Sequence, residues 1–385
     1  RSMALRGIKV IEFGGLAPGP FCGMVLADFG ASVIRIDKIG SETERDCLGN
    51  GKMSLALNLK TTEGINIVKK LCKKSDVLIE PFRTGVMEGL GLGPNDLLKE
   101  NPQLIYARLT GYGTNGIYSK RAGHDINYLS VSGLLSLLGR ANEKPIAPVN
   151  LIADFGGGGL SCAFGIVLAL LERTSSNLGQ VVDCSMVEGA AYLGSWLYRS
   201  QHLPLWGEAR GKNMLDTGTH FYDTYETKDG KFMAIGPLEP HFYQKLLKGL
   251  GLKEDEVFQF GDYDESKKLF TKLFLEKTQE EWCKIFDGCD ACVTPVLSLD
   301  EAPLHPQNVE RNAFVVSHDN GQLVPSPAPK LSRTPGDSQA IRPPPKRGQH
   351  TLNILQELGY TANEISRLEN VNAVEVYREL QPAKL

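Results

Sequence analysis

Residues 8–37 read IKVIEFGGLAPGPFCGMVLADFGASVIRID, two apolar runs separated by a helical pattern. Residues 8–13 and 31–37 are typical of buried strands, and residues 19–30 predict a helix that ends at Gly30. The alternation continues, with strands expected at 53–59, 76–82, 104–110 and 180–186 and helices at 62–75, 158–174 and 186–202. Such alternation predicts an α/β fold with a mostly parallel sheet covered on both faces.

The pattern changes after about residue 203, where glycine and proline become frequent. A hairpin signal around Lys-Asp-Gly follows, and then three helical patterns at 240–251, 264–275 and 278–287. Residues 321–348 are proline-rich and predicted to be extended, with two helices after them. We therefore expect a large domain that starts at 3–202, a linker at 203–220, a small α+β domain at 221–320 and a return segment at 321–385.

Composition excludes several classes of function. The formal charge is −3, from 42 Lys and Arg against 45 Asp and Glu, which does not favour nucleic acid or an anionic membrane as partner. No apolar run approaches the roughly 20 residues of a membrane span, so none is expected. The eight cysteines are scattered, and Cys289 and Cys292 lack a second pair, so we expect reduced thiols and no metal. The glycine-rich turn after the first strand, FGGLAPGPF, does not form a G-x-G-x-x-G motif and is interrupted by Pro18 and Pro20, and no P-loop lysine followed by Ser or Thr is present, which argues against a nucleotide cofactor.

A Gly-His-Asp triplet lies in RAGHDINYLS, residues 121–130, at the start of an apolar segment. His124 has the chemistry of a general base at the start of a helix. Alternatively, Asp125 complements the dipole of that helix and His124 has no role. The residues by themselves leave both interpretations open.

A second candidate site lies in NLIADFGGGGLSCAFG, residues 150–165. Asp154 ends an apolar run with the character of a strand, and four glycines and a long helix follow. Because glycine loses much conformational entropy on folding, we favour a backbone that approaches a ligand and presents N–H groups at a helix N-terminus. The alternative is a close contact between helices or subunits. Glu239, in GPLEPHFY, precedes another helix and by itself is typical of an N-cap.

Six segments carry a resemblance over nearly the whole chain: GLAPGPFCGMVLADFGA, IEPFRTGVMEGLGLG, AGHDINYLSVSG, NLIADFGGGGL, GQVVDCSMVEGAAYL and HPQNVERNAFV. In this order they resemble the family III CoA transferases, and among them the branch of racemases that act on 2-methylacyl-CoA esters. The resemblance implies a Rossmann-like large domain, a small domain and a C-terminal return that packs on the large domain. It also implies a homodimer of two interlocked chains with active sites at the interface.

The resemblance implies an isomerase that interconverts (2R)- and (2S)-2-methylacyl-CoA thioesters, including branched-chain fatty acyl and bile-acid intermediates, through an enolate. His124 and Asp154 match the two acid/base groups, and Glu239 matches a glutamate that supports the histidine. No separate cofactor is implied, since CoA is part of the substrate. Backbone N–H groups of Asp154, Gly156 and Gly157 are suited to hold the enolate oxygen. For the acyl tail, Met186, Met214 and the segment around Trp206 are candidates only.

Contacts with CoA are implied for a larger set. Its members are Lys38, Ala56, Leu57, Asn58, Leu59, Lys60, Arg83, Ala122, Gly123, Asp125, Ile126, Asn127 and Tyr128. Gly89 departs from the family pattern, because relatives often carry a basic residue there, and this puts one phosphate contact in doubt.

Two other functions compete with this interpretation. A CoA transferase of the same fold would use Asp154 as a nucleophile, but such enzymes generally lack the Gly-His-Asp triplet. A non-catalytic acyl-CoA-binding protein would tolerate the loss of both His124 and Asp154.

The C-terminal tripeptide Ala383-Lys384-Leu385 is a close variant of the Ser-Lys-Leu address. It predicts recognition by the peroxisomal import receptor and a peroxisomal location. The family also allows a mitochondrial pool, for which this N-terminus has too few Arg and Ser residues to argue.

Overall fold

The computed structural model describes residues 2–41 and 46–379. The chain divides into two compact units. The larger unit holds the residues up to Ser132, Val149–Leu193 and the residues from Pro306 onward, and the smaller unit holds Gly133–Pro148 and Gly194–His305.

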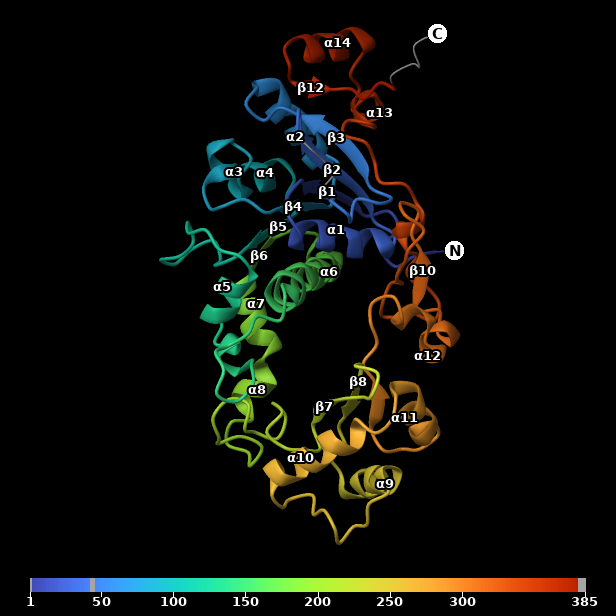
Figure 1. The fold of residues 1–385 in the computed structure, drawn as a ribbon. Helices are drawn as coiled ribbons and strands as arrows, with labels where there is room; N and C mark the ends of the chain where they lie inside the picture. The colour runs from blue at the N-terminus through green and yellow to red at the C-terminus, as the bar shows by residue number, and fades with distance from the viewer. Residues whose placement is uncertain (1, 42–45, 380–385) are drawn as a thin grey trace. The chain divides into compact units, whose positions relative to one another are not determined.

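A seven-stranded sheet in the order β12-β3-β2-β1-β4-β5-β6 forms the centre of the larger unit (Figure 1). Its strands are β1 (Lys9–Phe13), β2 (Ser32–Lys38), β3 (Met53–Leu57), β4 (Val77–Glu80), β5 (Ile105–Thr110), β6 (Val181–Ser185) and β12 (Val374–Glu375). All neighbours pair in parallel except β12, which runs antiparallel to β3. The predicted α/β class and parallel sheet are confirmed, with one antiparallel edge strand that was not predicted.

Helices connect and cover these strands: α1 (Pro18–Asp28), α2 (Thr62–Lys73), α3 (Val86–Gly89), α4 (Pro94–Glu100), α5 (Asp125–Val131), α6 (Ser161–Ser176), α7 (Met186–Leu193), α12 (Pro306–Glu310), α13 (Thr351–Glu357) and α14 (Ala362–Asn370). Helix α2 illustrates why these segments are helical. The Thr61 side chain caps the helix by accepting from Gly64 N, and Ile67, Val68 and Leu71 form its buried face. Leu355 of α13 joins the core of the sheet, so the return of the chain after residue 306 completes that core.

The segment before α6 differs from the prediction. Residues Leu151–Leu160 form a wide-turn helix, η2, that runs directly into α6, where a strand-like run up to Asp154 and a helix from residue 158 were expected. The resulting helix, Leu151–Ser176, has 26 residues and is long and apolar enough to cross a membrane by length and composition only. Core helices of soluble proteins pass the same test, and the expectation of no span rested on a helix that begins only at residue 158.

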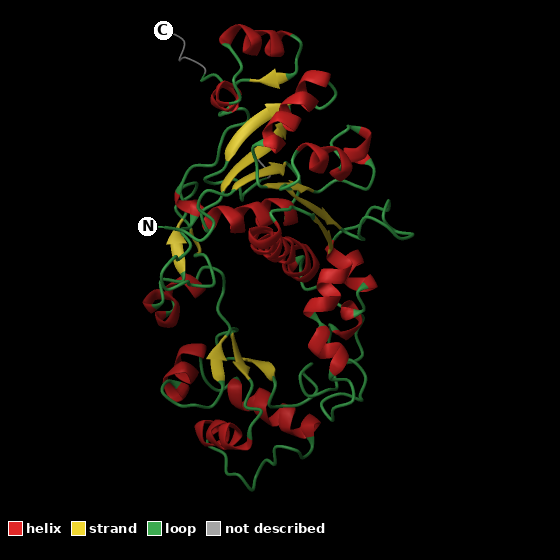
Figure 2. Cartoon of the chain, turned by 180° about the vertical axis from the view of Figure 1, so that it is seen from behind, coloured by secondary structure: helices red, strands yellow, loops and turns green. Residues whose placement is uncertain are grey.

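The smaller unit contains an antiparallel sheet of β7 (Asp223–Glu226), β8 (Phe232–Ile235) and β9 (Val293–Pro295) (Figure 2). Its helices include α8 (Ser195–Arg199), α9 (Pro240–Leu250), α10 (Tyr263–Phe274) and α11 (Gln279–Phe286). Its core is aromatic, with Phe221, Phe270 and Trp282 fully or almost fully buried. The expected linker lies inside this unit, which ends at His305, whereas the pair β10 (Phe314–Val316) and β11 (Leu323–Pro325) belongs to the larger unit.

Candidate active site

Two of the predicted site residues lie at the beginnings of two helices of the larger unit. His124 is the N-cap of α5, and its backbone N–H donates to Asn127 Oδ1 at 3.1 Å. Asp154 lies in the first turn of the Leu151–Ser176 helix and is half-buried, while His124 is exposed. The chain therefore presents an imidazole and a carboxyl group from two separate helix starts.

The carboxyl group of Asp125 joins these two helix starts. Its Oδ2 accepts hydrogen bonds from the backbone N–H groups of Ala153 and Asp154, both at 2.8 Å. Asp125 is only 3% exposed, so it is placed inside the protein rather than on a CoA-binding surface. The N–H of Asp154, expected to face an enolate oxygen, is likewise already paired with Asp125.

Asp154 lies near His124, because its backbone N–H bonds the carboxylate of Asp125, the residue that follows His124. Burial raises the pKa of the Asp154 carboxyl above its ordinary value, and the negative charge of Asp125 raises this pKa further. A hydrogen bond from Asn150 Nδ2 to Asp154 Oδ2 at 3.2 Å and the charge of His124 lower the pKa of Asp154. His124 and Asp154 are therefore close enough to interact through their charges.

The four glycines after Phe155 pack closely against other helices. A Cβ atom on Gly157 would lie 2.3 Å from the backbone N of Ala190, and one on Gly159 would lie 2.7 Å from Pro18 O. A helix also leaves N–H groups open in its first turn, which here begins at Leu151 and not at the glycines. Gly156 and Gly157 thus do not stand at a helix N-terminus, and the helix contact that the sequence analysis ranked second accounts for the glycine at 157.

Tyr128 fixes the loop that leads to His124. Its hydroxyl donates to Gly123 O, and its ring leaves no room for a Cβ at Gly111 or Gly123, with distances of 2.1 and 2.7 Å to Cε1. Burial raises the pKa of Tyr128 to about 12, the charge of Asp154 adds to this rise, and Arg83 opposes it. Tyr128 and Arg83 therefore belong to the same neighbourhood as Asp154.

Arg83 is exposed and lies in a loop that is flanked by two ion-paired glutamates, Glu80 and Glu88. Arg108 Nε bonds Glu80 Oε1 at 2.7 Å, and Arg108 Nη1 bonds Glu88 Oε1 at 2.6 Å. The other oxygen of Glu80 accepts from Phe82 N at 2.8 Å, and Glu88 Oε2 accepts from Gly85 N at 3.1 Å. This network was not predicted from the sequence, although a charged residue in each of two otherwise apolar strands was its visible signal.

The other predicted CoA contacts are divided between surface and core. Lys38, at the end of β2, and Lys60 are exposed. Ala56 and Leu57 are buried in β3, which pairs with β12 on the side away from β2. Their side chains are therefore not available to a ligand. The remaining positions are Asn58 and Leu59, which are half-buried, and Ala122, Ile126 and Asn127, which are exposed.

Glu239 lies in the smaller unit as the N-cap of α9, and its side chain is exposed. Its backbone carbonyl accepts from Phe242 N and Tyr243 N at 3.1 Å, whereas its carboxylate makes no capping hydrogen bond within the part of the chain that the structure describes. The support of His124 by Glu239 stays a prediction.

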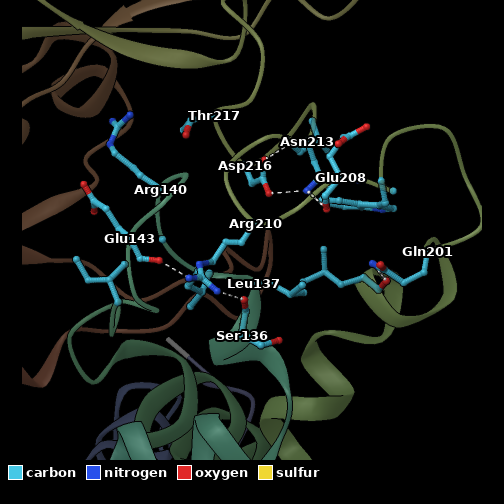
Figure 3. Close-up of a pocket in the computed structure, with 17 residues that line it drawn as sticks. Ser136, Leu137, Arg140, Glu143, Gln201, Glu208, Arg210, Asn213, Asp216 and Thr217 are labelled. Atoms are coloured by element: carbon cyan, nitrogen blue, oxygen red, sulfur yellow. Dashed lines mark hydrogen bonds between the residues drawn. The ribbon is translucent and has the colours of Figure 1, made fainter.

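A cavity of about 610 Å³ lies within the smaller unit (Figure 3). The apolar part of its wall comes from Leu137, Leu197 and Trp206. Arg210 also lines the cavity, and its Nη1 donates to Ser136 O at 3.1 Å. Of the other candidates for the acyl tail, Met186 is buried against Gly158 and Met214 packs on the aromatic core. Among the described residues no three His, Cys, Asp or Glu side chains form a group that could hold a metal ion.

The comparison with protein families now identifies the class. CoA-transferase family III matches residues 5–351, and the chain belongs to this family. It is 55% identical over 378 residues to alpha-methylacyl-CoA racemase of Mus musculus, covering 97% of this chain and 98% of the relative. The alpha-methylacyl-CoA racemase of Homo sapiens is 54% identical over 376 residues, again covering 97% of this chain and 98% of the relative. Among solved structures, Rv3272 from M. tuberculosis aligns with a TM-score of 0.75 and 26% identity over 91% of this chain and 99% of that chain.

Proposed function

We propose that this protein is an isomerase that interconverts the (2R) and (2S) forms of 2-methylacyl-CoA thioesters. The observation that carries the proposal is the approach of His124 and Asp154 from two helix starts joined by Asp125. The relatives that share more than half of its residues over 97% of its length are alpha-methylacyl-CoA racemases.

Inversion at the α-carbon requires one base and one acid on opposite sides of the carbon. His124 takes the α-proton of one enantiomer while protonated Asp154 returns a proton to the opposite side, and the roles exchange in the reverse direction. Free histidine and aspartate differ by more than two pKa units, near 6.5 and about 3.9. Burial raises the pKa of Asp154 and so narrows this difference, which allows either group to serve as base.

Isotope exchange at the α-carbon tests the proposal. Wild type incubated in D2O with either enantiomer should incorporate deuterium without any acceptor acid. His124→Ala and Asp154→Ala should each lose exchange first from a different enantiomer, because each removes the base for one side. Exchange that required an added carboxylate acceptor would instead make the protein a transferase with Asp154 as nucleophile.

We also propose that two chains form a homodimer that covers an apolar face of α6. Phe164, Leu168 and Leu171 lie at helical spacing on that face and are 60%, 48% and 66% exposed. Sedimentation of Leu168→Glu should show a shift toward monomer, whereas Gln356→Glu, which adds the same charge at an exposed position of α13, should sediment like wild type. Equal masses for both variants and wild type at every concentration would contradict this interface.

The proposed location is the peroxisome, through the import receptor that reads Ala383-Lys384-Leu385. This tripeptide lies outside the described residues. A fluorescent protein fused at the N-terminus should coincide with a peroxisomal marker, and Leu385→Asp should disperse it. Wild-type fluorescence in mitochondria would identify the second pool instead.

A further inference from the structure

A buried carboxylate that the racemase chemistry does not use lies next to His124 in the chain. Asp125 is 3% exposed, and burial of a carboxylate is unfavourable unless hydrogen bonds or charges compensate for the lost water. It begins α5, yet its Oδ2 accepts from Ala153 and Asp154, in the next helix start. Asp125 Oδ1 is buried with no hydrogen-bond partner among the described residues. Retaining such a group calls for an explanation.

We propose that Asp125 is a positioning residue that holds the two acid/base groups of the site at a fixed separation. The proposal rests on the function proposed above. Asp125 is covalently next to His124, and two hydrogen bonds of 2.8 Å tie it to the backbone at Asp154. This path bypasses the chain of residues 126–153 that otherwise separates the two helix starts.

The geometry explains why a carboxylate serves here. The first turn of the Leu151–Ser176 helix has N–H groups without partners inside the helix, and its dipole favours a negative charge there. One oxygen atom that accepts both N–H groups fixes the backbone of Asp154 directly and not through a flexible side chain. Because a displacement of about 1 Å can lower a rate by about 100-fold, such a backbone tie suits a two-base reaction.

Asp125 also acts on Asp154 through its charge. The groups that act on the Asp154 carboxyl are Asp125, which raises its pKa, and Asn150 and His124, which lower it. Tyr128 also faces Asp154, because the charge of Asp154 raises the pKa of Tyr128. Removing the charge at Asp125 should therefore lower the pKa of Asp154 and shift the limbs of the pH–rate profile that Asp154 controls to lower pH.

Amide hydrogen exchange tests the two hydrogen bonds of Asp125 without any catalytic assay. The amides of Ala153 and Asp154 should be protected in the wild type and lose this protection by at least about 10-fold in Asp125→Ala. Asp125→Asn keeps an oxygen acceptor and should retain part of the protection. Asp28→Asn is the matched control, because Asp28 is another buried carboxylate that accepts a backbone N–H, from Gln339 at 2.8 Å. Protection at 153 and 154 that is unchanged in Asp125→Ala would overturn the proposal.

Kinetics then test the catalytic consequence on the dimeric enzyme. Asp125→Ala should lower kcat by about 100-fold with KM within about 3-fold, and Asp125→Asn by about 10-fold with the Asp154 limb at lower pH. Asp28→Asn should leave both kcat and the profile unchanged. Asp125 variants that lose only thermal stability, with wild-type kcat and pH profile, would overturn the proposal. If wild type exchanged no α-proton, the proposed function would fail. Amide exchange would still show whether Asp125 holds the backbone at residues 153 and 154.

Discussion

The two units bury their polar groups in opposite ways. In the larger unit, charged side chains lie among the strands as ion pairs, such as Lys52 with Glu12 at 2.8 Å and Arg108 with Glu80. In the smaller unit, His220 is fully buried among aromatic rings, and its Nε2 bonds Tyr243 OH, while its Nδ1 has no hydrogen-bond partner among residues 2–41 and 46–379. The larger unit carries His124, Asp154 and the Arg83 loop. Buried ion pairs thus occur in the unit that carries the candidate site, while the smaller unit relies on apolar packing.

The largest effect is expected where the larger unit has no room. Gly157→Val places a side chain 2.3 Å from the backbone N of Ala190, and neither helix can move without disturbing the sheet beneath. We expect a loss of about 5 kcal/mol in unfolding free energy, at the upper end for single substitutions. Calorimetry should therefore detect little folded protein. Gly89→Val is the control, since a Cβ at Gly89 meets nothing within 4 Å. A soluble Gly157→Val with a wild-type melting temperature would instead support the ligand-facing interpretation of the glycines.

The ion pairs of the larger unit can be broken at Arg108. Arg108→Leu leaves Glu80 buried without its partner, which should cost about 4 kcal/mol of unfolding free energy. It also releases the Arg83 loop, so KM for the CoA ester should rise more than kcat falls. Glu80→Gln combined with Arg108→Leu should recover much of the stability, because the uncompensated charge is gone, but should not recover KM. Denaturant titration and steady-state kinetics separate the two effects. Equal changes in kcat and KM for the single variant would show that Arg108 does not position this loop.

The sequence predicted the sheet well because apolar strands carry a local signal. Each of the six parallel strands lies within two residues of its predicted bounds, from β1 to β6. Residues 151–157 were misassigned because a short apolar run is equally consistent with strand and helix, and glycines argue against a helix. What decides the helix is a distant contact between Gly157 and Gly189, which no local pattern contains.

The candidate site shows the same division between local and distant information. His124 and Asp154 were selected as candidates from their motifs. The two hydrogen-bond partners of Asp125 lie 28 and 29 residues further along the chain, and no local sequence spacing predicts such a contact. Ala56 and Leu57 were assigned to CoA from the resemblance, although the same apolar run predicts their burial. Motifs therefore pointed to the candidate acid/base groups, whereas the contacts around them required the fold.

A fall in pH should change the stability of the two units in opposite directions. Burial lowers the pKa of His220 from 6.5 to about 4, so its neutral form contributes stability that is present above pH 6.5 and lost as pH falls toward 4. The loss approaches about 3 kcal/mol at the lower limit. In the larger unit burial raises the pKa of Glu12 to about 7 and of Asp28 to about 6. Their contribution has the opposite sign, because it is present below about pH 4 and is lost as pH rises through 6 to 7.

All three tryptophans lie in the smaller unit, so their fluorescence follows its unfolding alone. The urea midpoint from fluorescence should fall between pH 6.5 and 4, and His220→Gln should reduce this dependence. Amide exchange in β1 and β2 follows the larger unit over the same pH range. A fluorescence midpoint in wild type that did not change with pH would remove the contrast between the two cores.

The smallest effect is expected at Gly89, where the resemblance to the family leads us to expect a basic residue. Gly89 ends α3 in the ion-paired segment that carries Arg83, and a side chain there enters open space. Gly89→Arg should add a cation for a CoA phosphate and lower KM about 3- to 10-fold with kcat unchanged, since a contact made equally in ground and transition states changes binding alone. The gain should fade as ionic strength rises. Gly89→Gln, similar in length but uncharged, should keep the wild-type KM. If both variants lowered KM equally, the gain would reflect a stiffer helix end rather than phosphate binding, and the ion pairs of Arg108 alone would set the position of the Arg83 loop.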